Sequence, residues 1–310
     1  MHWCFWMTSQ SQIHRGEAIT RGRLSIRAAA SLGPGFIWLI LFFLIPLGII
    51  AAMSFLSRGE DGTVDRPLTL ENYRRLAGFG LLGFDPLYPI ILFRSFVLGS
   101  GTAMLCLTAG LPLAFFIAKL SKPFKQLALT LVVIPFWTNL LIRTYAWQML
   151  LGPGSWITQL AVWLRVIGPD EALYPGTFAV YLCMVCDFLP FMVLPLYASV
   201  EKLDWSMAEA AMDLGANRFQ VFRHGVLPQI QPGVIAGLIL VFLPATGQFV
   251  IPDLLGGAKT AMLGNAIQQQ FGPGLDWPFG SAVALVSLAV ALAGLWLFTR
   301  KTADQNLEIV

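Results

Sequence analysis

The chain has 310 residues, of which 56% are hydrophobic and only 12% charged, and its formal net charge is +3. Charged residues make up about 25% of an ordinary soluble domain, so this chain lacks the polar surface that a water-soluble fold of its size needs. A soluble enzyme, a disordered chain and a nucleic-acid-binding protein all fit poorly. Lipid is instead expected to solvate much of the surface.

Six segments are long and apolar enough to cross a bilayer, which takes about 20 residues. They predict an all-α polytopic membrane protein whose six transmembrane helices lie at residues 32–56, 90–118, 126–150, 176–199, 232–255 and 280–299. The transmembrane domain then covers residues 32–299, between an N-terminal tail at 1–31 and a C-terminal tail at 300–310. We expect membrane lipid around it and no nucleic acid among its partners.

Several predicted spans contain proline, among them Pro135, Pro190 and Pro244. Each proline removes a backbone donor and bends its helix, and only neighbouring helices can satisfy the freed carbonyl groups inside a membrane. We therefore expect kinked helices packed together in a bundle. Gly233 and Gly237, four residues apart in the fifth span, favour close helix packing.

Cysteine and histidine give little sign of metal or redox chemistry. Cys183 and Cys186 form a C-x-x-C pattern inside an apolar run, with no second cysteine pair and no nearby histidine. Small buried hydrophobic side chains on one helix face explain them better than a metal site does. No metal site, catalytic constellation or bound cofactor is expected in this chain.

The distribution of Lys and Arg sets the orientation. When the N-terminus is placed inside, the segments on the inner side hold most of the basic residues outside the spans. We therefore expect both termini in the cytoplasm. The longest inner segment is then the loop over residues 201–231, between the fourth and fifth spans.

This loop predicts two short helices. Ser206 followed by Glu209 reads as a capping box at the start of the first helix, and Gly215 suits its left-handed end. Asn217 is placed to cap a second short helix over 218–224, before Leu227 and Pro228.

The first of these helices carries an apolar face made of Met207, Ala210, Ala211 and Leu214. A helix shorter than about 12–15 residues does not hold itself together in water, so this face has to be buried. It docks either under the chain's own bundle or into a groove on a cytoplasmic partner.

The same loop resembles the EAA loop of ABC-importer permeases. Glu209-Ala210-Ala211, Gly215 and Leu227-Pro228 stand at the spacing of that motif, although Gly225 replaces the usual isoleucine. The resemblance implies the type I, MetI-like permease fold, with the helices of this loop coupling the spans to an ATPase.

Other segments resemble the spermidine/putrescine permeases of this family, namely residues 70–75, 135–147, 188–197 and 247–257. Gln248 stands where those relatives more often carry glutamate. The resemblance implies a polyamine importer in the bacterial inner membrane. Permeases for iron, phosphate, sulfate or thiamine share the loop and give the alternative cargoes, and an ion-driven secondary transporter is a more distant alternative.

The resemblance also implies partners: a second, similar permease that completes the pore, two copies of a cytoplasmic ATPase, and a periplasmic solute-binding protein. ATP and Mg²⁺ would act in the ATPase, because this chain has no G-x-x-x-x-G-K-[ST] loop. The chain itself is therefore expected to be a transport subunit and not an enzyme.

Charged residues within the spans are costly and for this reason suggest function. Asp187 in the fourth span either pairs with Arg143 of the third or faces the pore and binds an ammonium group. Asp253, near the outer end of the fifth span, is the second candidate. Trp137 and Tyr145 could add cation–π surface along the pathway, although aromatic residues there also serve as packing or interface anchors.

Overall fold

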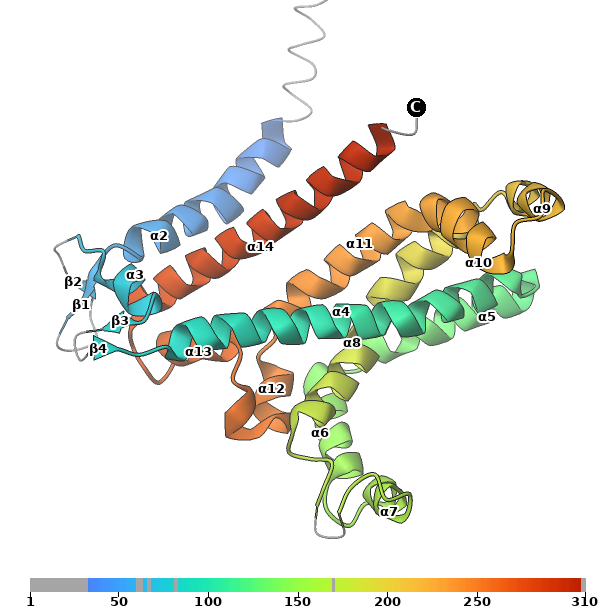
Figure 1. Ribbon diagram of the computed structural model, residues 1–310. Helices are drawn as coiled ribbons and strands as arrows, with labels where there is room; N and C mark the ends of the chain where they lie inside the picture. Colours follow the sequence, from blue (N-terminus) through green and yellow to red (C-terminus); the bar gives the residue numbers. More distant parts are fainter. Residues whose placement is uncertain (1–32, 60–63, 66–67, 81–82, 169–170, 308–310) are drawn as a thin grey trace, which may run out of the picture.

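The computed structural model describes residues 33–59, 64–65, 68–80, 83–168 and 171–307. The predicted N-terminal tail at 1–31 lies outside these residues. The long apolar helices run roughly alongside one another, and short elements cap the bundle at both ends (Figure 1). We call the end that carries residues 57–84 the loop end, and the end that carries residues 201–226 the coupling end.

The first described part of the chain forms one long apolar helix and then the short elements of the loop end. One helix spans Gly33–Met53, and its second half is α2 (Ile45–Met53), which follows the π-helical turn η1 (Ile40–Leu44). The loop end then consists of two small antiparallel hairpins around one short helix, in the order β1 (Ser57–Arg58), β2 (Val64–Asp65), α3 (Glu71–Leu76), β3 (Phe79–Gly80) and β4 (Gly83–Phe84).

Three helices form the centre of the bundle: α4 (Leu87–Lys119), α8 (Thr177–Val200) and α11 (Leu227–Thr246). Their shared core contains small and aliphatic side chains, including Cys106, Cys183, Met192 and Val241. The prediction that both cysteines of the C-x-x-C pattern are buried is confirmed for Cys183, whereas Cys186 is only half-buried. Among the described residues, no group of three His, Cys, Asp or Glu side chains could hold a metal ion.

The predicted close packing at Gly233 and Gly237 is confirmed. A Cβ atom at Gly233 would collide with Ser199 and Pro195 of α8, and one at Gly237 would collide with Met192. Because only glycine allows the two backbones to approach this closely, the pair fixes α11 against α8.

The third predicted span is broken. It consists of α5 (Lys122–Val133), the 3₁₀ turn η2 (Ile134–Trp137) and α6 (Leu140–Leu151), and the two halves meet at an angle of 94°. Pro135 lies in the turn, and Asn139 caps α6 by accepting a hydrogen bond from the Leu141 amide. The continuous span predicted at 126–150 is therefore wrong in shape. Helix α6 and the following α7 (Trp156–Trp163) project from the bundle (Figure 1).

The fifth predicted span, at 232–255, is also corrected. Helix α11 ends at Thr246, and a separate segment follows, made of α12 (Val250–Leu255), the 3₁₀ turn η4 (Gly257–Thr260) and α13 (Leu263–Phe271). The break is fixed from outside the helix, because the Asn265 side chain donates a hydrogen bond to the Phe249 carbonyl.

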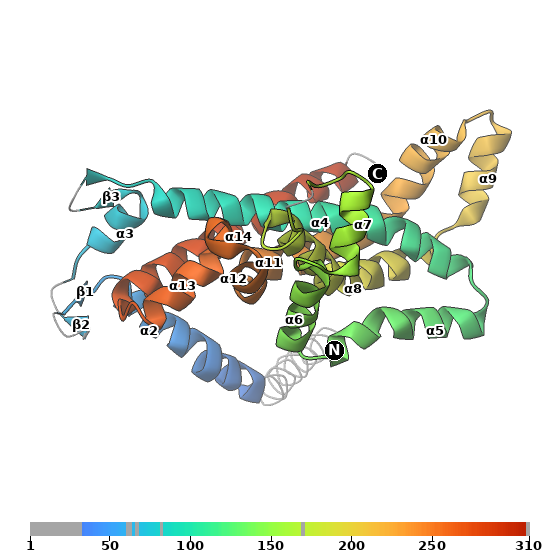
Figure 2. The same ribbon diagram turned by 90° about the horizontal axis from the view of Figure 1, so that it is seen from below.

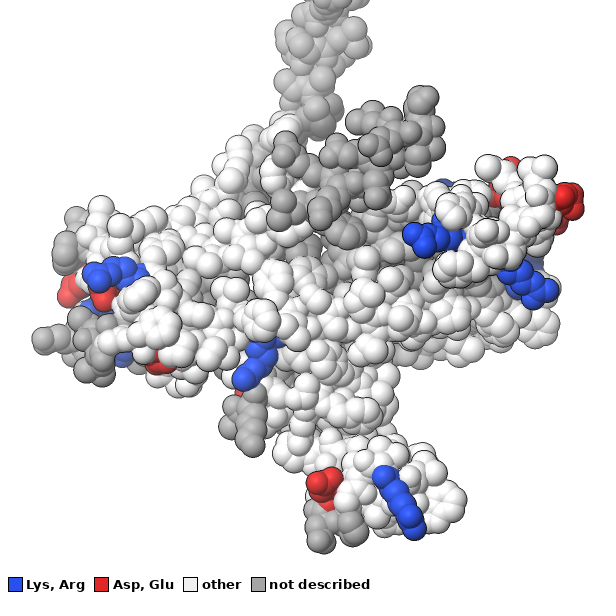
Figure 3. All heavy atoms as spheres, in the orientation of Figure 1, with Lys and Arg blue, Asp and Glu red and all other residues white. Residues whose placement is uncertain are grey.

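The last helix, α14 (Trp277–Leu307), contains the sixth span and continues over most of the predicted C-terminal tail. It packs against α2. The prediction of six spans agrees with five long apolar helices plus the bent pair of α5 and α6. Charged side chains on the face shown in Figure 3 gather mainly at the two ends and around α7, and most of the surface between them is uncharged.

Candidate functional site

The loop over residues 201–231 forms most of the coupling end. Its first helix is α9 (Trp205–Asp213), and Asp204 caps it by accepting hydrogen bonds from the backbone amide and the hydroxyl of Ser206. The predicted capping box of Ser206 and Glu209 is therefore wrong. Asp204 has the extended backbone that a capping residue needs, and Ser206 already lies inside the helix.

Gly215 ends α9 as predicted. Its φ is +88°, in the left-handed region that residues with a Cβ rarely adopt. The amides of Gly215 and Ala216 donate back to the carbonyls of Met212 and Ala211, at 2.9 and 3.1 Å. The turn is thus held by backbone hydrogen bonds alone, and the direction of the chain after α9 depends on this one glycine.

The second helix of the loop is not a separate element. Asn217 caps α10 (Arg218–Gln220) as predicted, through a reciprocal capping box with Gln220. Helix α10 then continues through a π-helical turn, η3 (Val221–Val226), into α11, so that residues 218–246 form one helix. The wider π turn directly precedes Pro228, which cannot continue an α-helix without losing a hydrogen bond.

Only part of α9 is buried in the chain itself. Ala208 is the one buried residue of α9, and Ala211 packs beside it against the core. The rest of the predicted apolar face is open: Ala210 is exposed, Met207 is 57% exposed and Leu214 is 90% exposed. Phe219 on α10 is exposed as well. Exposed apolar residues gathered in this way mark an interaction surface, which favours docking on a partner over docking under the bundle.

The other residues of the EAA pattern lie around this surface. Glu209 and Ala210 are exposed on α9, and Leu227 and Pro228 are exposed at the start of α11. Gly225, which replaces the usual isoleucine, has open space where a side chain would begin. Gln229 joins the two halves of the loop, since its amide accepts from the Asp204 amide and donates to the Gly225 carbonyl.

A polar contact that sequence reasoning missed anchors the start of this loop. Lys125 of α5 pairs with Glu201 at 2.9 Å. Hydrogen bonds from Tyr197 and Lys125 hold the pKa of Glu201 below its ordinary value of 4.5. Trp205 of α9 also contacts Phe115 of α4, with ring centroids 6.4 Å apart. The only signal in the sequence was a pair of opposite charges in two loops expected on the same side of the membrane.

The two carboxylates predicted within the spans have different surroundings: Asp187 is buried and paired, and Asp253 is exposed. Arg143 Nε lies 2.6 Å from Asp187 Oδ1, and the Asp187 side chain is only 5% exposed. Of the two alternatives for Asp187, the structure therefore shows the ion pair, and Arg143 also donates to the Pro135 carbonyl at the bend of the third span. Asp253, in contrast, is exposed on α12 and forms no ion pair with another described residue.

The two aromatic candidates lie near the bend of the third span. Trp137 ends η2 and is 80% exposed, and Tyr145 on α6 is 52% exposed. Gln248 is half-buried at the break after α11, and its side chain accepts a hydrogen bond from the next amide, that of Phe249. It therefore serves the local turn in this structure.

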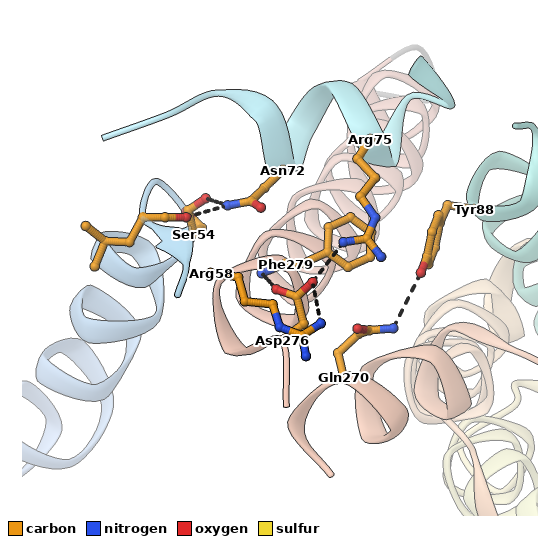
Figure 4. A network of polar contacts seen from close by, with 9 residues as sticks. Ser54, Arg58, Asn72, Arg75, Tyr88, Gln270, Asp276 and Phe279 are labelled. Atoms are coloured by element: carbon orange, nitrogen blue, oxygen red, sulfur yellow. Dashed lines mark hydrogen bonds and ion pairs between the residues drawn. The ribbon is translucent and has the colours of Figure 1, made fainter. Parts of the chain in front are cut away.

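A second polar cluster missing from the sequence-based expectations lies at the loop end (Figure 4). Asp276, whose side chain is 4% exposed, accepts a 2.8 Å hydrogen bond from Arg75 of α3, and Arg58 lies 4.0 Å away. The Arg75 guanidinium also stacks over the ring of Phe279, 4.1 Å from its centroid. Asn72 donates to the carbonyls of Ser54 and Leu56, which follow α2.

We call this cluster, made of Arg58, Asn72, Arg75 and Asp276, the outer clamp. It joins the end of the first span to the start of the last through α3. Asp276 is the one carboxylate of the sequence between Asp253 and Asp304, and this isolation was the signal that could have found it.

Comparison with known proteins identifies the family. Residues 110–300 match the model of the binding-protein-dependent transport system inner membrane component. The spermidine/putrescine transport system permease protein PotB of Haemophilus influenzae is 42% identical over 88% of this chain and 92% of its own length. The PotB protein of Escherichia coli is 40% identical over 88% of this chain and 96% of its own length.

The fold agrees with a solved permease. A crystal structure of a bacterial alginate ABC transporter, in complex with an alginate-pentasaccharide-bound periplasmic protein, superposes with a TM-score of 0.68 at 17% identity. The match covers 91% of this chain and 94% of the other. The MetI-like fold predicted from the EAA loop is confirmed, and the ion-driven alternative is excluded. The chain belongs to the binding-protein-dependent inner membrane components, and it is a multi-pass permease subunit of an ABC importer whose ATPase is a separate subunit.

Proposed function

We propose that this permease imports polyamines, with putrescine and spermidine as cargo. The observation that carries the proposal is the 42% identity, over 88% of the chain, to a permease named for these two amines. The ion pair in the third and fourth spans is compatible with such a cargo. Arg143 is neutralised by Asp187, which leaves no buried positive charge there to repel an organic cation.

The energy for transport enters through the coupling end. Two ATPase subunits use ATP and Mg²⁺, and one of them receives the exposed side chains of Met207 and Leu214 in a surface groove. Glu209, Ala210 and Ala211 form the rest of that contact, together with Leu227 and Pro228 on α11. Support comes from the exposure of this surface in the chain alone. No part of the described chain covers it.

Movement of the ATPases is transmitted along a helix. Closure around ATP displaces α9, and Gly215 sets the angle at which this displacement reaches α10. Because α10 and α11 are one helix, the spans rearrange with it, and the pathway alternates between its two sides. The bent third span and the interrupted fifth span are the elements able to change shape.

The remaining partners are a second permease and a periplasmic binding protein. A similar but different permease, in a heterodimer, completes the pathway, and the binding protein delivers the polyamine from the periplasmic side. Both termini then lie in the cytoplasm, in agreement with the excess of basic residues on that side. Trp137 and Tyr145, both exposed, are available to the cargo or to the second permease.

Reconstitution tests this function. The permease is purified with its native partners, the ligand on the co-purified binding protein is identified, and uptake of labelled putrescine and spermidine into proteoliposomes is measured. ATP-dependent uptake of either amine is the expected result. Uptake of iron, phosphate, sulfate or thiamine, with no uptake of either amine, would overturn the assignment of the cargo.

A further inference from the structure

The segment between α11 and α14 leaves α4 at Thr246, packs as α12 against α6 and α8, and returns to α4 at Leu263. Helix α13 begins beside α4, where the Leu263 amide donates to the Ser95 hydroxyl at 2.7 Å. Ser95 lies eight residues inside α4, about 12 Å from its loop end at 1.5 Å per residue. At its other end α13 reaches Tyr88, whose hydroxyl accepts a 3.4 Å hydrogen bond from Gln270.

Backbone that is not α-helical precedes this helix in two stretches. Residues 247–249 and 256–262 lie outside α-helices. Irregular backbone at this depth is stable only where protein buries it or where it borders water, because lipid satisfies no hydrogen bond. The glycines Gly256 and Gly264 allow the protein to bury it, since a Cβ at either would collide with neighbouring atoms.

Helix α13 has two different faces. Leu263, Ala266 and Ile267 pack toward α4 and α14. Asn265, Gln268 and Gln269 share the opposite face at spacings of three and four residues, and the two glutamines are exposed. Amide side chains are costly against lipid, so this face is expected to border the aqueous pathway.

A cavity of about 440 Å³ lies against this polar face. Among the described residues that line it, Asp253 carries the one charged group, and the three amides of α13 and apolar side chains such as Pro252, Ala261 and Pro273 make up most of the rest. Among the described residues, neither Asp253 nor the two exposed glutamines has a side-chain hydrogen-bond partner or an ion pair. Asp187, in contrast, is already paired with Arg143.

We propose that this cavity is an ammonium-binding station on the translocation pathway. Asp253 pairs with one terminal ammonium group of a linear polyamine, the side-chain oxygens of Gln268 and Gln269 accept its remaining N–H groups, and the apolar wall contacts the methylene chain. The proposal rests on the polyamine function proposed above and assigns the cation to Asp253 rather than to Asp187.

The test uses the complete transporter in proteoliposomes, with labelled putrescine delivered by saturating binding protein. In Asp253→Asn we expect import to fall about tenfold or more, the size of a lost charge-assisted hydrogen bond. ATPase stimulation by the loaded binding protein should stay within twofold of wild type. The matched control is Asp65→Asn, which removes an exposed carboxylate of the loop end and should import at the wild-type rate.

Two further variants test the cavity itself, one by returning a carboxylate to it and one by removing an amide from it. Asp253→Asn combined with Gln268→Glu returns a carboxylate to the same cavity and should recover at least a third of the import. Gln268→Leu, at an exposed position, should lower import severalfold with ATPase stimulation retained.

Three results would overturn the proposal. The first is import by Asp253→Asn at the Asp65→Asn rate. The second is loss of ATPase stimulation in step with import, which would assign Asp253 to coupling. The third, failure of the wild-type transporter to import either amine, would remove the polyamine function as well, whereas the first two leave that function intact.

Discussion

The two ends of the bundle are held together by different kinds of contact. At the loop end, the outer clamp joins the first and last spans with a nearly buried carboxylate, two arginines and an amide. At the coupling end, the turn after α9 is held by backbone hydrogen bonds, and large apolar side chains remain open. Polar contacts between distant segments hold the loop end together, although Leu68, Phe79 and Phe84 are exposed there, whereas the coupling end turns at one glycine and presents apolar side chains on α9 and α10.

The largest effect is expected at the loop end. Asp276→Ala leaves two arginines without their carboxylate and removes the acceptor for the Phe279 amide. Breaking a buried pair costs about 3–5 kcal/mol, and because both arginines reach water we expect about 2 kcal/mol here. Thermal unfolding in detergent measures it, with Asp65→Ala as control. Equal melting temperatures for the two variants would show that the clamp does not hold the spans together.

The next effect is expected at Gly215. Valine in the left-handed region costs about 1–2 kcal/mol, enough to turn α9 away from its present direction. We expect Gly215→Val to insert in the membrane at a normal level but to lose coupling between ATPase and uptake. Gly225→Ala, at a position with open space, is the control. Normal uptake by Gly215→Val would refute the proposed role of the turn.

A smaller effect is expected for the exposed apolar surface. Leu214→Ser should leave the melting temperature of the isolated permease unchanged, because this side chain is already 90% exposed. It should weaken ATPase binding by about 1 kcal/mol, somewhat less than the value of burying a whole leucine. Thermal unfolding of the isolated permease gives the melting temperature, and a titration of ATPase onto the purified permease gives the affinity. A lower melting temperature with unchanged ATPase affinity would mean that the residue serves the chain itself.

The smallest effect concerns the one ion pair at the base of the coupling loop. The pKa of Glu201 is lowered in the folded protein. The stability that Glu201 contributes is therefore complete at a pH above its ordinary pKa of 4.5 and is lost as the pH falls through the lowered pKa. Glu201→Gln should therefore destabilise the protein slightly at neutral pH and not in strong acid. Melting curves across this range, compared with those of wild type, test the sign. A difference that grows toward low pH would contradict it.

Much of this architecture followed from hydropathy. The positions of the spans are set by runs of apolar residues, and the left-handed turn at Gly215 and the cap at Asn217 are local features that short patterns reveal. The ion pair of Arg143 and Asp187 could be foreseen because an isolated charge in a membrane needs a partner.

Prolines predicted kinks, and Pro135 lies in the bend of the third span, but the break after Thr246 could not be foreseen because it depends on contacts between segments far apart in the sequence. The break after Thr246 is fixed by Asn265 from α13, and hydropathy averaged over a window does not detect it. The cap of α9 was misassigned because Asp204 and Ser206 are both good capping residues, and only the backbone conformation distinguishes them. The outer clamp joins residues about 200 positions apart, beyond the reach of any local pattern.

The π-helical turn before Pro228 has a mechanical consequence. It joins α10 of the coupling loop and α11 of the fifth span into one continuous helix of 29 residues, about 44 Å long at 1.5 Å per residue. In the proposed mechanism, a small tilt of α10 by the ATPase would therefore move the far end of α11, which lies at the interruption before α12 and Asp253. A flexible joint at Pro228 would take up this movement. A continuous helix would transmit it to the cavity at Asp253, where we propose that the cargo binds.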